Sequence, residues 1–282
     1  MPTPPTAPNG TLIRERNFLY GPPGVGKTHQ FFNIAKWHQE LGSPARFYGI
    51  SSDTAYEALI CNTEFEGLTN IEWTDVTDFQ DYIDAAKHYH EIVKQGDWVS
   101  VDLLDGAWAA AADEYAQGVA KEKGMHIDDL GDLWKEEGGS DYPIKGWDWG
   151  IINARYRRFT NRWLLTSRAH LMLVSGEVKL TEPTDKMRAQ EDAIARRTRE
   201  MFKHVGTKPM GQKEDPFRWH SVLRVDCRDE GGEIRKQQIV TAKERYGNRR
   251  MWGKRMQNGV VRPEPMEDYF MDYLVKTAGW EI

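Results

Sequence analysis

Hydrophobic residues alternate along most of the chain between short runs of strand length and longer stretches with helical spacing. The apolar runs predict strands at residues 18–20, 46–50, 71–76, 98–104 and 169–175. The helical spacing predicts helices at residues 28–41, 78–95, 107–121 and 151–167. Because strands that alternate with helices form parallel sheets covered on both faces, this pattern predicts an α/β fold with a mostly parallel central sheet.

The pattern changes after residue 179. It predicts a polar helix at residues 184–204, a loop at 205–216, strands at 218–227 and 234–243, and a last helix at 265–277. Gly231 and Gly232 lie between the two strands and indicate a hairpin turn. The chain is therefore expected to end in a β-hairpin and a helix.

The length of 282 residues fits one large α/β domain, which we place at residues 11–282. Residues 1–10 are rich in proline and threonine and are predicted to form a disordered arm. Residues 123–148 combine glycines, acids and tryptophans without a regular pattern and are interpreted as an insertion. The chain is thus expected to be a single domain with one excursion.

Composition excludes several classes of protein. No apolar run approaches the roughly 20 residues of a membrane span, and the N-terminus lacks the features of a signal peptide, so the chain is expected in the cytoplasm. Cys61 and Cys227 are far apart and have no zinc-site spacing. The net charge of −5 disfavours a generally basic nucleic-acid binder, although basic residues cluster at 155–168, 188–203 and 236–255. A solvated helix face explains these clusters as well as a nucleic-acid surface does.

The segment Gly-Pro-Pro-Gly-Val-Gly-Lys-Thr fits the phosphate-binding pattern GxxxxGK[ST] and lies between a predicted strand and a predicted helix. Glycines let backbone N–H groups approach phosphate oxygens at the positive end of the helix dipole. Lys27 should reach the β- and γ-phosphates of ATP, and the Thr28 hydroxyl should bind Mg²⁺. The predicted nucleotide-binding residues are Gly21, Pro22, Pro23, Gly24, Val25, Gly26, Lys27 and Thr28.

A second carboxylate for the metal is expected at the end of a neighbouring buried strand, and Asp102 occupies that place. Asp102 is therefore predicted to hold Mg²⁺ together with Thr28, and the alternative is that it caps a helix. Asp105 is interpreted as the cap of the helix that begins near Gly106.

Hydrolysis also requires a group that orients the attacking water. Asp53, just past the second predicted strand, is the first candidate, and Glu57 is the second. Asp53 fits equally well as the N-cap of a helix at residues 54–60. Ser175, at the tip of a buried strand, and Glu177 are candidates to sense the γ-phosphate.

Four features together resemble a known family. They are the GPPGVGKT segment, the strand that ends at Asp102, the segment WDWGIINARYRRFTNRWLL at residues 147–165 with the strand after it, and KERYG at residues 243–247. This combination resembles the phage RecA-like ATPases of the Sak type. KERYG also resembles the lysine-x-arginine-aromatic-glycine motif of the bacterial RadA/Sms branch-migration proteins.

The resemblance implies a RecA-like P-loop NTPase core that hydrolyses ATP and forms homo-oligomeric rings or filaments on single-stranded DNA. It also implies a role in phage recombination or replication beside single-strand-binding or replication proteins. Lys243 and Arg245 would reach the γ-phosphate of the neighbouring subunit, and residues 179–217 occupy the place of a DNA-binding loop region. Asp53 stands where RecA-like proteins usually have glutamate. The alternatives are an AAA+ loader or remodeller of a protein partner, and a nucleotide-gated assembly protein with little turnover.

Overall fold

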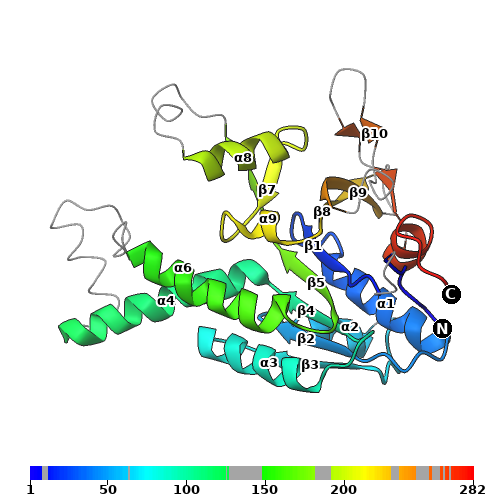
Figure 1. Ribbon diagram of the computed structural model, residues 1–282, viewed down its shortest axis with the longest axis horizontal. Helices are drawn as coiled ribbons and strands as arrows, with labels where there is room; N and C mark the ends of the chain where they lie inside the picture. Colours follow the sequence, from blue (N-terminus) through cyan, green and yellow to red (C-terminus); the bar gives the residue numbers. More distant parts are fainter. Residues whose placement is uncertain are drawn as a thin grey trace.

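The computed structural model describes residues 1–7, 12–62, 64–124, 126, 148–181, 192–229, 235–245, 254–255, 261–262, 264–266 and 268–282. An eight-stranded sheet with the order β12-β9-β8-β1-β5-β4-β2-β3 forms its centre (Figure 1). Its strands are β1 (Arg16–Tyr20), β2 (Phe47–Ser51), β3 (Ile71–Asp75), β4 (Trp98–Asp102), β5 (His170–Ser175), β8 (Ser221–Asp229), β9 (Arg235–Glu244) and β12 (Glu264–Pro265).

Helices precede and follow most of these strands. They are α1 (Lys27–Glu40), α2 (Ala55–Asn62), α3 (Phe79–Ile92), α4 (Leu104–Lys123), α6 (Asp148–Phe159), α8 (Ala193–Phe202) and α9 (Asp215–Arg218), with the π-helical segments η1 (Thr160–Leu165) and η3 (Tyr269–Val275). Two small antiparallel pairs lie outside the main sheet: β6 (Glu177–Lys179) with β7 (Thr207–Pro209), and β10 (Lys254–Arg255) with β11 (Val261–Arg262).

The six strands from β8 to β3 run parallel to one another. At one side β9 is antiparallel to β8, and β12 is antiparallel to β9. β5 lies between β1, which leads into the phosphate-binding segment, and β4, which ends at Asp102. The predicted α/β fold class, with a mostly parallel central sheet flanked by helices, is confirmed.

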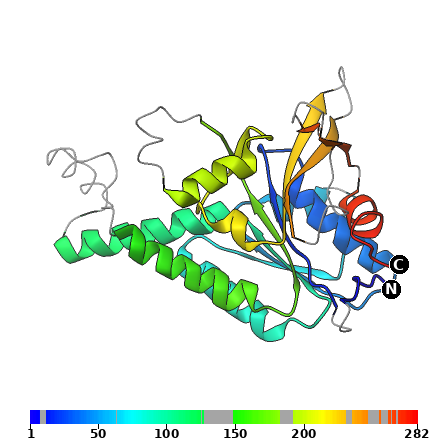
Figure 2. The ribbon, with the colours of Figure 1, turned by 45° about the horizontal axis from the view of Figure 1, so that its top comes forward.

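The sheet is buried on both faces (Figures 1 and 2). On one face Leu19, Phe47 and Trp98 pack with residues of α1 and η3. On the other face Phe18 and Val101 pack with residues of α3, α4 and α6. Because both faces are covered, the central strands consist of nearly continuous apolar residues, which is why they were visible in the sequence.

Asp78 begins α3 as predicted. Its side chain accepts a hydrogen bond from the N–H of Asp81 at 2.9 Å, and the Asp81 carboxylate accepts one from the N–H of Asp78 at 3.3 Å. This reciprocal pair satisfies two N–H groups that the first helical turn leaves without partners.

The helix predicted at residues 151–167 differs in the structure, because α6 ends at Phe159 and continues as η1. Thr160 lies at the junction, and its hydroxyl donates to the carbonyl oxygens of Tyr156 and Arg157 at 3.2 and 3.4 Å. A threonine hydroxyl that bonds back to the preceding turn competes with the regular helical ladder, which accounts for the local change of pitch.

The loop predicted at residues 205–216 contains β7 and the start of α9. Contacts with α6 hold α9 in place: the Tyr156 hydroxyl donates to Asp215 at 2.6 Å, and Arg157 pairs with Glu214 at 2.7 Å. These partners are far away in the sequence, so the glycines and prolines of the segment indicated only a loop.

Residues 1–7 also differ from the predicted disordered arm. The backbone of Thr3 exchanges two hydrogen bonds with Glu281, at 2.8 and 3.0 Å, so the two ends of the chain lie side by side (Figure 1). Most of the insertion predicted at residues 123–148 and the turn at Gly231 and Gly232 lie outside the described residues. Within the described part of the chain, no helix is both long and apolar enough to cross a membrane.

Candidate nucleotide-binding site

The carboxyl ends of the central strands meet at one edge of the sheet. Tyr20 is level with Ser175, and Ser51 is level with Asp102, so β1, β5, β2 and β4 all end there. The phosphate-binding segment follows Tyr20 directly. The fold therefore brings the predicted segment, Asp53, Asp102 and Ser175 to the same edge, as expected for parallel strands.

The loop between β1 and α1 has the backbone shape that its glycines permit. Gly24 and Gly26 have φ angles of 73° and 82°, in the left-handed region that favours glycine, and Gly26 directly precedes α1. Gly21 is required for another reason, because a Cβ there would lie 2.0 Å from the carbonyl oxygen of Val225 in β8. The loop is thus shaped at the N-terminus of a 14-residue helix, where anions bind.

Lys27 is almost fully buried beneath this loop. Its ammonium donates to the carbonyl oxygens of Gly21 and Pro22, at 3.0 and 2.7 Å. Burial lowers the pKa of Lys27. Carboxylates at the same edge act in the opposite direction on its pKa; they are Asp102, Asp105, Glu177 and Asp53. The Lys27 ammonium is therefore held beneath the loop, with several acidic groups near it at the same edge of the sheet.

Thr28 and Asp102, the two residues predicted to bind Mg²⁺, are in direct contact. The Thr28 hydroxyl donates to Oδ2 of Asp102 at 2.5 Å, and Asp102 is 1% exposed. Burial raises the pKa of Asp102 to about 7, the hydrogen bond from Thr28 opposes this shift, and nearby Asp53 adds to it. One hydroxyl and one carboxylate suit Mg²⁺, which keeps several water and phosphate ligands. No cluster of three or more His, Cys, Asp or Glu residues suited to a metal occurs among the described residues.

Asp53 and Glu57 are exposed at the start of α2. Oδ1 of Asp53 accepts a hydrogen bond from the N–H of Ala55 at 3.0 Å, so the capping contact considered as an alternative is present. Asp53 is also close enough to Lys27 and Asp102 to influence the pKa of each. The catalytic role of Asp53 stays a prediction, with Glu57 as its second candidate.

Ser175 is fully buried, and its hydroxyl donates to the carbonyl oxygens of Gly176 and Met210, at 3.0 and 3.2 Å. These contacts fix the backbone after β5, and γ-phosphate sensing by Ser175 stays a prediction. Asp105 differs from the expected helix cap. It lies in the first turn of α4, and its Oδ1 accepts from the N–H of Gly176 at 3.2 Å, which ties α4 to the end of β5.

The sequence reasoning missed Arg224, a mostly buried residue of β8 level with Tyr20. Its guanidinium donates to both carboxylate oxygens of Glu177, at 2.8 and 3.2 Å, to Asp226 at 2.7 Å and to the Thr207 hydroxyl at 2.9 Å. Arg224 thereby joins the main sheet to the β6–β7 pair. A basic residue between the apolar residues Leu223 and Val225 was the available signal.

Lys243 and Arg245 lie on the side of the sheet that is remote from their own phosphate-binding loop. The N–H of Arg245 donates to His220, whose own N–H donates to Arg16, so Arg245 is level with the start of β1. β1 ends about 13 Å further along, at Tyr20, because a strand rises about 3.3 Å per residue, and the loop follows that end. Lys243 is level with Val222 and thus with Phe18 of β1, and Arg245 is level with Arg16, so Arg245 is the further of the two from the loop.

The two basic side chains contact the segment around α9. The ammonium of Lys243 donates to the carbonyl oxygens of Pro216 and Trp219, at 2.8 and 2.6 Å, and Arg245 donates to the carbonyl oxygen of Phe217. Burial, together with Arg245 and Arg197, lowers the pKa of Lys243 to about 7. Lys243 is half-buried and Arg245 is exposed, so Arg245 is the more available of the two to a neighbouring subunit.

No model of a known protein family matches the sequence, and no curated protein matches it. Among solved structures, a KaiC-like protein from the hyperthermophilic archaeon Pyrococcus horikoshii OT3 is similar, with a TM-score of 0.47 and 11% sequence identity. The similarity covers 90% of this chain and 93% of that chain. The strand order and the loop geometry described above determine the fold class. A likeness at this level says nothing about the function of this chain.

Proposed function

We propose that this chain is a magnesium-dependent ATPase that works as an oligomer on single-stranded DNA in phage recombination or replication. The observation that carries the ATPase proposal is the pairing of Thr28 with Asp102 at 2.5 Å, beside the buried ammonium of Lys27. A phosphate-binding loop, a cation and a metal-binding pair at one sheet edge are the parts that phosphoryl transfer requires.

Each residue has a distinct task in this proposal. The ammonium of Lys27 exchanges the carbonyl oxygens of Gly21 and Pro22 for phosphate oxygens when ATP binds. Thr28 and Asp102 would hold Mg²⁺, which would supply positive charge to the phosphate oxygens. Asp53, exposed at the same edge, orients the attacking water. The protein contributes mainly by positioning these groups and by electrostatic stabilisation.

Helix α8 is the favoured contact for DNA within the predicted region 179–217. Arg196 and Lys203 are exposed there, and no ion pair of either is found among the described residues. On the competing α6 face Arg158 is exposed as well, but Arg155 and Arg157 are paired with glutamates at 2.6 and 2.7 Å. Unpaired surface cations are the groups that replace counterions on a phosphate backbone. The described residues thus favour α8 over α6.

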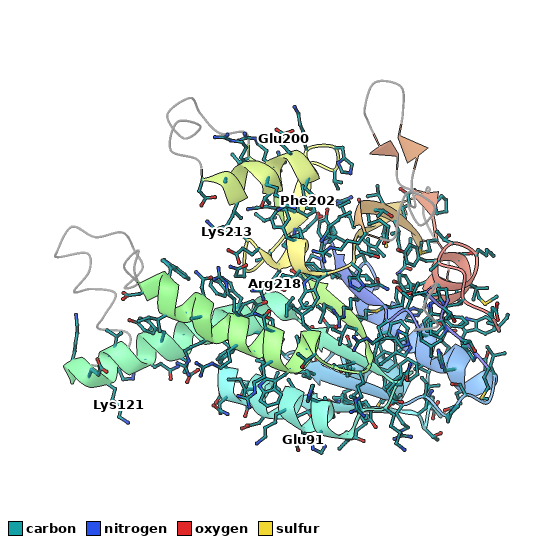
Figure 3. The ribbon with its side chains drawn as sticks, viewed as in Figure 1. Glu91, Lys121, Glu200, Phe202, Lys213 and Arg218 are labelled. Carbon is teal, nitrogen blue, oxygen red and sulfur yellow. The ribbon has the colours of Figure 1, made fainter. Side chains whose placement is uncertain are left out.

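α8 is also connected to the nucleotide edge. Phe202, which Figure 3 labels on α8, is fully buried. Its ring packs edge-on against that of Tyr20, which directly precedes Gly21, with ring centroids 5.7 Å apart. The Tyr20 hydroxyl donates to the carbonyl oxygen of Thr207 at 3.3 Å. These contacts connect the residue before the phosphate-binding loop to the helix that we assign to DNA binding.

One set of measurements tests the function as a whole. The ATPase rate and the particle size are compared with ATP alone, with single-stranded DNA and with duplex DNA. We expect single-stranded DNA to raise the rate and ATP to enlarge the particle. Turnover that ignores DNA favours an AAA+ loader or remodeller of a protein partner, and ATP binding with hardly any turnover favours a nucleotide-gated assembly protein. Absence of ATP binding overturns the proposal.

A further inference from the structure

A side chain from the C-terminal hairpin reaches the outer surface of the phosphate-binding loop. Gln237 lies on β9, directly across from Cys227 of β8. Its Nε2 donates to the carbonyl oxygen of Val25 at 2.7 Å and to that of Gly26 at 3.3 Å. No pattern in the sequence indicated this contact, because 211 residues separate Gln237 from Gly26.

The orientation of the Gln237 amide is determined by its partners. Two carbonyl oxygens can only accept hydrogen bonds, so the nitrogen of Gln237 must face the loop. Its oxygen accepts from the Nε2 of Gln30 in α1. The oxygen of Gln30 in turn accepts from the N–H of Tyr269 at 3.0 Å. Since the last donor is a backbone N–H, neither glutamine side chain can be flipped without loss of a hydrogen bond.

The loop has a physical need for such a donor. Peptide groups that turn their N–H toward bound phosphates turn their carbonyl oxygens toward the other side, where they need partners. Gln237 supplies a donor to both Val25 and Gly26 from that side, and the thiol of Cys227 also donates to the carbonyl oxygen of Val25, at 3.7 Å. The approach is close, because a Cβ on Gly26 would lie 2.1 Å from Nε2 of Gln237. Glycine at position 26 therefore permits both the close approach of Gln237 and the left-handed backbone.

We infer that Gln237 is a positioning residue that holds the loop of Val25 and Gly26 in the shape that receives the phosphates of ATP. This inference rests on the proposed nucleotide binding. It assigns to the C-terminal hairpin a task at the chain's own site, in addition to the task proposed for Arg245 at a neighbouring one. The positions of Gln237 and Arg245 both depend on the register of the antiparallel pair of β8 and β9.

The test compares Gln237→Met, which keeps the length of the side chain and removes its donor, with Gln238→Met as the matched control. Gln238 is the neighbouring glutamine on the same strand, where successive side chains point to opposite faces. Equilibrium ATP binding is measured in the full chain by calorimetry, together with the unfolding temperature with and without ATP. We expect Gln237→Met to bind ATP about fivefold to tenfold more weakly, which corresponds to the loss of one or two hydrogen bonds, with kcat little changed and KM raised.

A second variant keeps the inference falsifiable if Gln237→Met folds poorly. Gln237→Glu has the same shape but faces the two carbonyl oxygens with a carboxylate, so we expect weaker ATP binding than in Gln237→Met. ATP affinity equal to that of the wild type in either folded variant overturns the inference. If the wild-type chain itself binds no ATP, the proposed function fails first, and the two failures are thereby distinguished.

Discussion

Thr28 in the first turn of α1 and Asp102 at the end of β4 are joined by a hydrogen bond of 2.5 Å, although 74 residues separate them. The contact exists because β1 and β4 are parallel strands on either side of β5, so that both end at the same edge. The Thr28 hydroxyl donates to the Asp102 carboxylate, whose charge a metal ion would otherwise neutralise. The strand order of the fold therefore brings together the two side chains that are proposed to bind Mg²⁺.

We expect Asp102→Asn to reduce magnesium-dependent ATP turnover by about 100-fold, because the metal contributes several kcal/mol to transition-state stabilisation. ATP binding without Mg²⁺ should change far less. The measurement is turnover as a function of Mg²⁺ concentration, with Asp113→Asn, an exposed carboxylate of α4, as the control. Equal turnover in wild type and Asp102→Asn removes Asp102 from the metal site.

Lys27→Ala should abolish the stabilisation of the fold by ATP while leaving the fold intact. The ammonium of Lys27 is held by two carbonyl oxygens, and burial already lowers its pKa, so removing it costs little in the free protein. The unfolding temperature of the wild type should rise with ATP concentration, as it must for a ligand that binds only the folded state. Lys36→Ala, on the same helix, should behave as the wild type does. A normal rise in Lys27→Ala contradicts the assignment.

Lys243 should make stability depend on pH in the alkaline range. Burial first, and then Arg245 and Arg197, lower the pKa of Lys243 in the folded state from 10.5 to about 7, against an opposing effect of Glu244. Between these two values the unfolded chain binds more protons than the folded one, so the contribution of Lys243 to the free energy of unfolding rises with pH.

Urea unfolding at pH 7 and pH 10 checks this expectation. Lys243→Met lacks the titrating group, so the free energy of unfolding of the wild type minus that of Lys243→Met should increase from pH 7 to pH 10. Groups that titrate in both proteins, including the tyrosines, cancel in the difference. A difference that is constant with pH shows that Lys243 is not held in the surroundings described here.

The parts of the site that the sequence predicted are those determined by local pattern. The phosphate-binding segment joins a strand to a helix within about ten residues, and Asp102 directly follows an apolar run, so chain order alone placed both. The parallel arrangement then followed from the alternation of strands and helices. The only assumption needed was which strands lie beside one another in the sheet.

Arg224 and Gln237 could not be predicted in the same way, because their roles depend on the register of β8 and β9. A shift of one residue in that register would point each side chain to the opposite face. α9 was missed for a related reason, since Tyr156 and Arg157 of a distant helix hold it in place. Long-range contacts of this kind leave little local trace in one sequence.

If α8 binds single-stranded DNA, the double variant Arg196→Ala with Lys203→Ala should weaken binding and reduce its salt dependence. Each lost phosphate contact lowers the slope of log affinity against log salt by about 0.7, so two contacts change it by roughly 1.4. Lys121→Ala is the control, because Lys121 is an exposed lysine at the far end of α4 (Figure 3). An unchanged slope in the double variant assigns DNA binding to another surface.

The position of Arg245 leads to a prediction about assembly. Arg245 is level with the start of β1, whereas its own phosphate-binding loop follows the end of that strand, so we expect its guanidinium to serve the γ-phosphate of a neighbouring subunit. Arginines delivered in this way are worth about a thousandfold or more in rate. Arg245→Ala should therefore assemble normally and bind ATP, yet turn it over very slowly.

Mixing two inactive variants tests whether the site is shared. In a mixture of Arg245→Ala with Lys27→Ala, some interfaces combine an intact phosphate-binding loop from one subunit with an intact Arg245 from the next. Those interfaces should regain turnover, and the amount should follow the mixing ratio, because every active interface needs one subunit of each kind in the correct order. Lys243→Met provides a comparison: if Lys243 mainly secures the carbonyl oxygens near α9, its loss should lower stability more than it lowers turnover. If the variants co-assemble and every mixture stays inactive, Arg245 does not complete the site of its neighbour.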